Sequence, residues 1–284
     1  MEKRIALYDD CNVVEKTNHS SKSFTAFNTS IDIKNLETGE VIFKGLKNKV
    51  IIPGSGLIAR KLFDISSPEV TPSYNTVFGD AMYTPETDTP PTDIDSLVTK
   101  DEHKVLLFCC GIDGCGSENS QVYPVDYTKW MAPENMIPFR YQVGGNDLSD
   151  ELRRSYFGRT AINDGEYYAY YFKRFETPPT LIQQFVDGTP VDATIYNSAK
   201  VESAETYVEL TLRITKEDIR DFFIATVGID EARINSISLC SAYPVEEDGY
   251  VYYKEIRPLT KLNIPNEQMI DTTKGIEIIY HIYM

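Results

Sequence analysis

The sequence predicts a mainly β protein with a sandwich-like core, one or two short helices, long arms and a large insertion. Two observations carry this prediction. The 284 residues include 19 Tyr and 13 Phe against a single Trp, and β-branched residues are plentiful, a composition that favours strands. Stretches such as "YVELTLRI" also alternate apolar and polar residues, which is typical of a strand with one buried face. We expect a single β-rich domain over residues 1–284, long enough to bury a sizeable core.

The N-terminal third alternates short strand-like runs with turns. "SFTAFNTSIDIKNLETGEVIFKGLKNKVII" predicts two or three strands, with a turn from Glu37 to Glu40. "PGSGLIARKLFD" changes to a helical period and predicts a short helix that begins after Gly56. Residues 66–97 are rich in Pro, Thr, Ser and Asp, so we expect a long surface arm there.

The middle of the chain begins with a compact apolar run and continues irregularly. "HKVLLFCCGI" predicts a buried strand from Val105 to Cys110, ended by a glycine loop over Gly111 to Gly116. We expect residues 117–205 to form an insertion that elaborates the core. Within it, "EYYAYYFKRF" fits a helix or a strand, and its density of Tyr and Phe favours a strand.

The C-terminal third is the most regular part of the sequence. After the strand "YVELTLRI", Thr215 is expected to cap a helix over "KEDIRDFFIATVG". Glu217 and Asp218 lie in the positive first turn of this helix, and Gly228 ends it. "INSISLCSAYPV", "YVYYKEIRPL" and "GIEIIYHIYM" predict three further strands.

The charge balance excludes several classes of partner. Forty-three acidic residues against 28 basic ones give a formal charge of −15, so specific binding of nucleic acid or of an anionic membrane is not expected. "MEKRIALYDDCNVV" lacks the apolar core of a signal peptide, and no stretch approaches about 18 uninterrupted apolar residues. We expect synthesis in a cytoplasm, where the five cysteines remain reduced.

Three of the cysteines lie in "FCCGIDGCG", which raises the question of a metal site. Such a site would recruit His103, Cys109, Cys110 and Cys115. Adjacent strand residues point to opposite faces, and the spacing matches no paired C-x-x-C pattern. The prediction is therefore buried small thiols and no metal.

Catalytic constellations are also poorly supported. A cysteine nucleophile needs a base, and the chain offers only His19, His103 and His281. Of these, His281 lies in an alternating strand, where a packed histidine is the more frequent case. Gly54 and Gly56 precede a helix but lack the lysine of a phosphate-binding loop. With 43 acidic residues, pairs of carboxylates are so frequent that they do not indicate a catalytic site. We expect no enzyme activity and no cofactor.

Five landmarks, taken in order, carry a resemblance to a known family. They are "LKNKVIIPGSGLIARKLFD", "KVLLFCCGIDGCG", "YVELTLRITKEDI", "INSISLCSAY" and "RPLTKLNIPNEQMIDTTKGIEIIYHIYM". This order resembles bacteriophage virion proteins found among tail, neck and baseplate components. Asn48-Lys49-Val50 and the helix from Leu57 match the first part, and Phe108 to Gly116 stand where the family has a strand and a glycine loop. Ile234 to Tyr243 and Lys254 to Met284 match the two-strand finish.

The middle of the chain looks like a segment of virion structural proteins from crAss-like phages of gut bacteria. The resemblance implies a structural protein with neither catalytic residues nor a cofactor. It implies a homo-oligomeric ring at the neck or tail, in the portal-to-tail connector region. The expected partners are further copies of the chain and other virion proteins, namely portal, tail or capsid components. The expected location is the virion, assembled in the bacterial host cytoplasm.

Two aromatic regions are the expected contact surfaces, the proline-rich arm and "EYYAYYFKRF". Their interface candidates are Tyr74, Phe78, Tyr83, Tyr167, Tyr168, Tyr170, Tyr171, Phe172 and Phe175. One alternative is a capsid decoration or fibre module that binds host surface glycans on the tyrosine-rich segment. A second alternative is a virion-associated glycan hydrolase that uses unidentified carboxylates.

Overall fold

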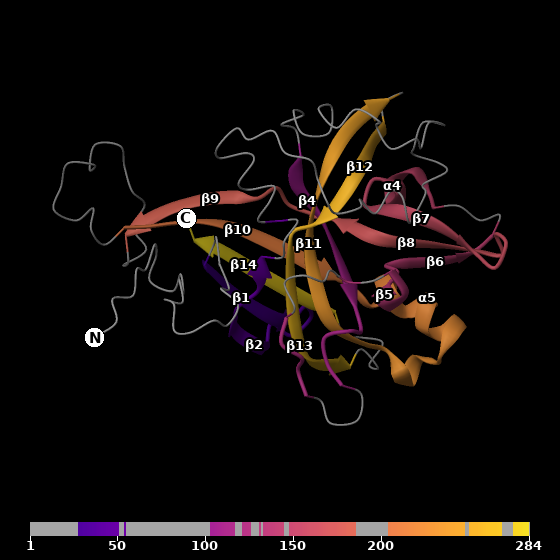
Figure 1. Cartoon of the computed structure of the whole chain (residues 1–284), viewed down its shortest axis with the longest axis horizontal. Helices are drawn as coiled ribbons and strands as arrows, with labels where there is room; N and C mark the ends of the chain where they lie inside the picture. The colour runs from indigo at the N-terminus through magenta and orange to yellow at the C-terminus, as the bar shows by residue number, and fades with distance from the viewer. Residues whose placement is uncertain are drawn as a thin grey trace, which may run out of the picture. The chain divides into compact units, whose positions relative to one another are not determined.

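The chain forms two compact units in the computed structural model, whose helices and strands are labelled in Figure 1. Unit 1 comprises residues 1–48, 176–213 and 276–284, and unit 2 comprises residues 49–175 and 214–275. The residues that the structure describes are 28–50, 54, 103–116, 121–125, 131, 133–144, 148–185, 204–247, 250–268 and 275–283. Each unit is therefore assembled from segments that lie far apart in the sequence.

Unit 1 is built on a five-stranded sheet with strand order β2-β1-β14-β10-β9. Its strands are β1 (Asn28–Asn35), β2 (Val41–Leu46), β9 (Thr180–Phe185), β10 (Ala204–Ile214) and β14 (Ile276–Tyr283). The β1–β2 connection is a tight turn in which the side chain of Asn35 accepts hydrogen bonds from the backbone N–H groups of Glu37 and Thr38. The predicted turn at Glu37 to Glu40 is thus confirmed.

The alternation seen in the sequence gives this sheet one buried face. Ile31 of β1 lies opposite Tyr280 of β14, and Ile33 lies opposite Ile278. These four side chains are fully buried. The same spacing in β10 buries Leu210, Leu212 and Ile214, because every second residue of a strand points to the same side.

Unit 2 contains a branched nine-stranded sheet whose main path is β3-β13-β11-β4-β8-β6. Off this path, β12 pairs with β11, β5 with β4, and β7 with β8. The strands are β3 (Lys49–Val50), β4 (Lys104–Gly111), β5 (Met136–Ile137), β6 (Arg140–Val143), β7 (Tyr156–Ile162), β8 (Tyr167–Arg174), β11 (Arg233–Glu247), β12 (Tyr250–Pro258) and β13 (Thr260–Gln268).

The core of unit 2 forms where β4 runs between β11 and β8. Strand β4 pairs with β11 from Lys104 to Gly111 and with β8 at Leu107 and Phe108. A buried cluster on one side of these strands contains Leu107, Cys109, Met131, Met136, Phe157, Phe172, Cys240, Ala242, Tyr253 and Ile256. Phe108, the neighbour of Leu107, packs instead on Phe139 and Phe175, with ring centroids 5.2 and 6.2 Å away. Both faces of β4 are therefore buried, as predicted for the apolar run.

Helices are short in the described part of the chain. Unit 2 has α4 (Asp150–Arg153), α5 (Lys216–Thr226) and two single 3-10 turns, η1 (Pro133–Asn135) and η4 (Ile229–Glu231). Helix α5 begins after Thr215, whose backbone N–H donates to the Asp218 carboxylate at 2.6 Å. Gly228 follows its end with φ of +98°, a backbone angle that glycine adopts without steric cost.

The predicted fold class is confirmed for the described residues, which are mainly antiparallel strands with two short α-helices. The aromatic segment is strand β8, as its composition favours. Strand β13 was not predicted, because Pro265 interrupts its pattern. The helix expected after Gly56 and the arm at residues 66–97 lie outside the described residues. Of the insertion at 117–205, the described part contains β5 to β9 and α4.

Candidate functional site

Among the described residues of unit 2, a buried polar cluster is centred on Asp218, the third residue of α5. The sequence places an acidic residue here because carboxylates cap the N-terminal N–H groups of helices and favour the positive end of the helix dipole. The packing of α5 against β6 turns the same side chain toward the sheet. Asp218 therefore caps the N-terminus of α5 and also bonds to side chains of the neighbouring strands.

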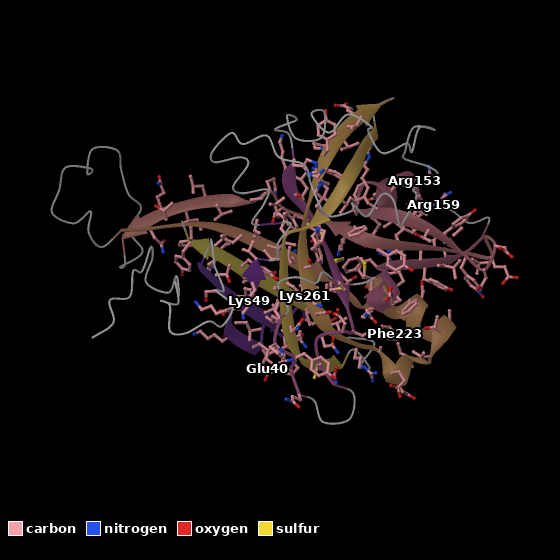
Figure 2. All side chains as sticks on the ribbon, viewed as in Figure 1. Glu40, Lys49, Arg153, Arg159, Phe223 and Lys261 are labelled. Atoms are coloured by element: carbon pink, nitrogen blue, oxygen red, sulfur yellow. The ribbon has the colours of Figure 1, made fainter. Side chains whose placement is uncertain are left out.

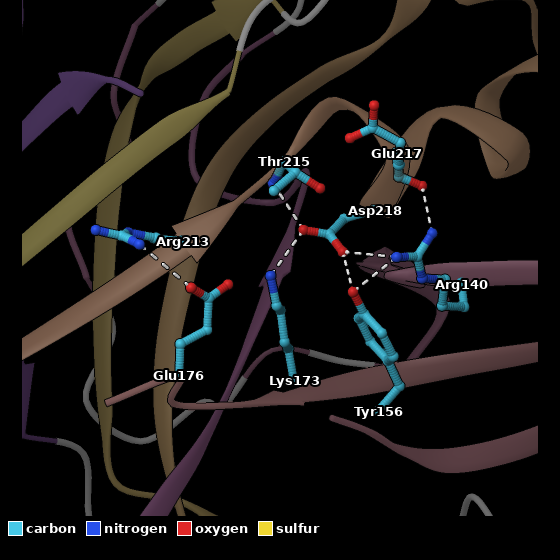
Figure 3. Close-up of polar contacts among 8 residues, drawn as sticks. All are labelled: Arg140, Tyr156, Lys173, Glu176, Arg213, Thr215, Glu217 and Asp218. Carbon is cyan, nitrogen blue, oxygen red and sulfur yellow. Dashed lines mark hydrogen bonds and ion pairs between the residues drawn. The ribbon is translucent and has the colours of Figure 1, made fainter. Parts of the chain in front are cut away.

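Figure 3 shows the donors that gather around the Asp218 carboxylate. Its Oδ2 accepts hydrogen bonds from Lys173 Nζ of β8 at 2.9 Å and from the Thr215 backbone N–H at 2.6 Å. Its Oδ1 accepts a hydrogen bond from Tyr156 Oη of β7 at 2.5 Å and lies 3.6 Å from Arg140 Nη2 of β6. One carboxylate thus joins α5 to three neighbouring strands.

Arg140 closes the cluster on the side of β6. Its Nη2 donates to Tyr156 Oη at 2.8 Å, and its Nη1 donates to the Glu217 carbonyl oxygen at 3.0 Å. The guanidinium carbon lies 4.6 Å from the centre of the Tyr156 ring, within the range of cation–π attraction. The Tyr156 hydroxyl therefore accepts a hydrogen bond from Arg140 and donates one to Asp218.

The cluster is shielded from water. The side chains of Asp218 and Lys173 are 0% and 3% exposed, and that of Arg140 is 17% exposed. Burial and the adjacent Asp218 carboxylate raise the pKa of Tyr156 well above its usual range, because both disfavour a phenolate. Oδ2 accepts two hydrogen bonds, and Oδ1 accepts one and is paired with Arg140, so this arrangement is suited to holding α5 against the strands.

Tyr156 makes the stability of unit 2 sensitive to alkaline pH. Because its pKa is raised in the folded state, its contribution is complete below about pH 10, where the unfolded tyrosine is neutral. That contribution falls as pH rises from there toward the folded pKa, with a slope of up to about 1.4 kcal/mol per pH unit. Tyr156→Phe should reduce the slope of unfolding free energy against pH, measured by urea unfolding between pH 8 and 11. Parallel curves for Tyr156→Phe and the wild type would contradict this expectation.

A second polar cluster fixes the glycine loop that follows β4. Asp113 accepts a hydrogen bond from Ser236 Oγ at 2.7 Å and pairs with Lys261 Nζ at 2.5 Å; Lys261 is labelled in Figure 2. The backbone N–H of Gly114 donates to the Asn235 side chain at 2.8 Å. A Cβ atom on Gly114 would lie 2.0 Å from the Asn235 carbonyl oxygen. The loop therefore lies directly against β11 and β13, and glycine is required for that close approach.

The structure places the neighbouring cysteines on opposite sides of β4, as the sequence predicted. Cys109 Sγ lies 3.9 Å from Cys240 Sγ, whereas Cys110 Sγ lies 4.0 Å from the Ile137 carbonyl oxygen. Burial raises the pKa of both Cys110 and Cys240, which keeps these thiols protonated and weakly nucleophilic. Among the described residues there is no group of three or more His, Cys, Asp or Glu side chains placed to hold a metal ion.

Removing one of these sulfur atoms should affect packing alone. We expect Cys109→Ala or Cys110→Ala to lower the free energy of unfolding by about 1–3 kcal/mol, because each leaves a small cavity in a fully buried site. Urea unfolding of the two variants provides the measurement. Elemental analysis is the check on the mechanism, since stoichiometric zinc in the wild type that is lost in Cys109→Ala would refute a packing role.

The aromatic interface candidates of β8 fall into two groups. Tyr170, Phe172 and Phe175 are buried in the chain's own core, so they present no surface to a partner. Tyr167, Tyr168 and Tyr171 keep partial exposure. Tyr167 stacks on Tyr141 with ring centroids 4.9 Å apart, the Arg159 guanidinium lies 4.3 Å from the centre of the Tyr168 ring, and Tyr171 packs against the core cluster. Tyr74, Phe78 and Tyr83 lie outside the described residues.

The histidines considered as catalytic bases lie in environments that favour packing. His103 is buried, with Nδ1 3.5 Å from Ser241 Oγ. His281, in unit 1, lies 2.9 Å from Glu209 Oε2 and packs against the rings of Tyr207 and Tyr283. His19 lies outside the described residues. The two described histidines thus contact hydroxyl, carboxylate and aromatic groups, as expected for packed side chains.

The Asp218 cluster was missed by the reasoning from sequence, which placed Asp218 only in the first turn of a helix. One signal was available. Lys173 directly follows the aromatic run "YYAYYF" within the same strand, and a lysine buried in such a strand needs a counter-charge. The sequence does not say which of its 43 acidic residues supplies that charge.

No family model, no curated protein and no solved structure matches the chain. Among the helices that the structure describes, none has the length and apolar character needed to cross a membrane.

Proposed function

We propose that this protein is a non-enzymatic structural component of a tailed-phage virion, and that its copies assemble into a homo-oligomeric ring at the neck or tail. Its partners in this role are its own copies together with portal, tail or capsid proteins. The ordered sequence landmarks that resemble phage virion proteins support the assignment. The polar clusters at Asp218 and Asp113 are consistent with it, because both fasten elements to one another.

The observation that carries the proposal is a difference between the two edge strands of the unit 1 sheet: β2 is irregular and β9 is regular. Edge strand β2 is irregular: its register against β1 shifts twice, and it contains the exposed Lys44 and a Gly45 with φ of +66°. Bulges and edge lysines are devices that prevent strand-to-strand association. Among the described residues no strand pairs with the outer edge of β9, which pairs with β10 in unshifted register from Thr180 to Phe185 and has none of these devices. A subunit that assembles through a sheet edge needs one such edge left open.

Two measurements test the proposal. Virions of a phage that encodes this sequence should contain the protein in many copies by quantitative proteomics, and the purified protein should form ring-sized complexes by mass photometry. A protein that stays monomeric at every concentration and is absent from virions would contradict the proposal. Binding on a glycan array that is lost in Tyr168→Ala would instead assign a receptor-binding role.

A further inference from the structure

Strand β9 is unusual in this chain because it carries no charge. Its sequence is Thr-Leu-Ile-Gln-Gln-Phe over Thr180–Phe185. Among the described strands of four or more residues, it is the one without Asp, Glu, Lys or Arg. Thr180, Ile182 and Phe185 have high β-propensity, and a six-residue segment of this kind with neither charge nor Pro nor Gly is typical of segments that pair with another strand.

The side chains of β9 keep exposure on both faces of the sheet: Leu181 and Gln183 are exposed on one face, and Ile182 and Gln184 are partly buried on the other. Leu181 is 62% exposed and lies opposite Val208, on the face that also carries Leu210 and Leu212. Ile182 lies opposite Tyr207 on the other face. An added strand would therefore gain backbone hydrogen bonds along the edge and apolar contact on each face. A charged partner strand would place unpaired charges against these apolar side chains, which is unfavourable.

A second copy of the same strand meets these requirements. The chain has a formal charge of −15, so two copies repel each other and approach most favourably where their surfaces are neutral. Antiparallel pairing of one strand with its own copy is the arrangement that a two-fold axis produces, with the same patch used on both sides. Gln183 and Gln184 contribute side-chain amides that donate and accept hydrogen bonds, so they can bond to polar groups of the partner strand.

We propose that β9 pairs antiparallel with β9 of a second copy of this chain across a two-fold axis, which joins two five-stranded sheets into one. The pair is the elementary contact of the assembly. This inference rests on the proposed role as an assembling subunit, and the experiment below separates the two. Ring closure then uses a further surface of the dimer.

The test compares two lysine substitutions at exposed apolar residues on opposite edges of the same sheet. Leu181→Lys places a charge on β9, and Val41→Lys places one on β2, where Val41 is 46% exposed. Light scattering after size exclusion at low salt should show the wild type and Val41→Lys as dimers or larger. Leu181→Lys should raise the dissociation constant of the pair by about tenfold or more. Circular dichroism and thermal unfolding verify that both variants are folded.

A charge-pair experiment identifies the partner strand. With the two-fold axis passing near Ile182, two copies of position 181 lie within about 10 Å, close to the Debye length at 0.1 M salt. Mixing Leu181→Lys with Leu181→Glu should therefore restore association that each variant loses alone. Restoration by mixing Leu181→Lys with Val41→Glu, and not with Leu181→Glu, would overturn the inference in favour of β9 pairing with β2.

The outcomes also distinguish this inference from the proposed function. If Leu181→Lys assembles as well as the wild type and the protein is still found in virions, the β9 pairing is refuted while the proposed function stands. A wild-type protein that remains monomeric refutes the pairing, and its absence from virions as well refutes the proposed function.

Discussion

Asp218→Asn is expected to lower the free energy of unfolding by about 3–5 kcal/mol, the usual loss when one partner of a buried ion pair is removed. The variant keeps the shape of the side chain and removes the negative charge that lies 2.9 Å from Lys173 Nζ, a side chain that is 3% exposed. It also weakens the hydrogen bonds from Tyr156 and the Thr215 backbone. Such a loss is a large fraction of the roughly 5–15 kcal/mol that typically stabilises a domain. Urea unfolding at neutral pH provides the measurement.

Two companion variants test the reason for this loss. Asp221→Asn removes an exposed carboxylate from the same helix and should leave the unfolding free energy nearly unchanged. Adding Lys173→Met to Asp218→Asn removes the buried positive charge as well, so the double variant should be more stable than Asp218→Asn alone. If both carboxylate variants on α5 lost equal stability, general helix charge would be the cause and the buried cluster would not.

Gly158→Ala is expected to lower the free energy of unfolding by about 2–4 kcal/mol, the sum of left-handed backbone strain and overpacking. Gly158 lies inside β7 with φ of +69°, and an added Cβ would come within 2.4 Å of the Phe172 ring. Phe172 is fully buried and belongs to the core cluster, so it has little room to move. The absence of a side chain at Gly158 therefore allows the Phe172 ring to pack directly on the backbone of β7.

A matched glycine isolates the contribution of the ring. Gly39 has φ of +71° in the exposed β1–β2 turn, and a Cβ added there would meet no atom within 4 Å. Gly39→Ala should lose only about 1 kcal/mol, from backbone strain. Urea unfolding of both variants gives the difference that the Phe172 contact explains. Equal losses in the two variants would show that the ring moves aside at no cost.

Local signals were sufficient to predict several elements of the fold. Thr215, Asp218 and Gly228 mark the limits of α5, and the alternation of Leu210 with Leu212 identifies the buried face of β10. Strand β13 was missed because Pro265 has no N–H to donate to a ladder. The structure accommodates this proline where the β13 register against β11 shifts, between the pairs Ser236–Asn263 and Ile234–Glu267.

The candidate site could not be predicted in the same way, because its contacts are distant along the chain. Asp218 lies 45 residues from Lys173 and 62 from Tyr156, and no local pattern selects these partners. Strand β8 posed a related problem. Its aromatic residues do not alternate with polar ones, so the sequence gives no sign that Tyr170 is buried while Tyr168 is partly exposed.

The order of strands in unit 1 has a consequence for how this unit folds during synthesis. Strand β14 lies between β1 and β10 in the sheet, although it follows all four of its companion strands along the chain. A ribosome therefore releases the two outer pairs, β1 with β2 and β9 with β10, before the strand that connects them exists. Long-range pairing of this kind slows folding and leaves strand edges exposed to aggregation meanwhile. Unit 1 is thus expected to complete its sheet late, with the inner edges of both pairs exposed until β14 emerges.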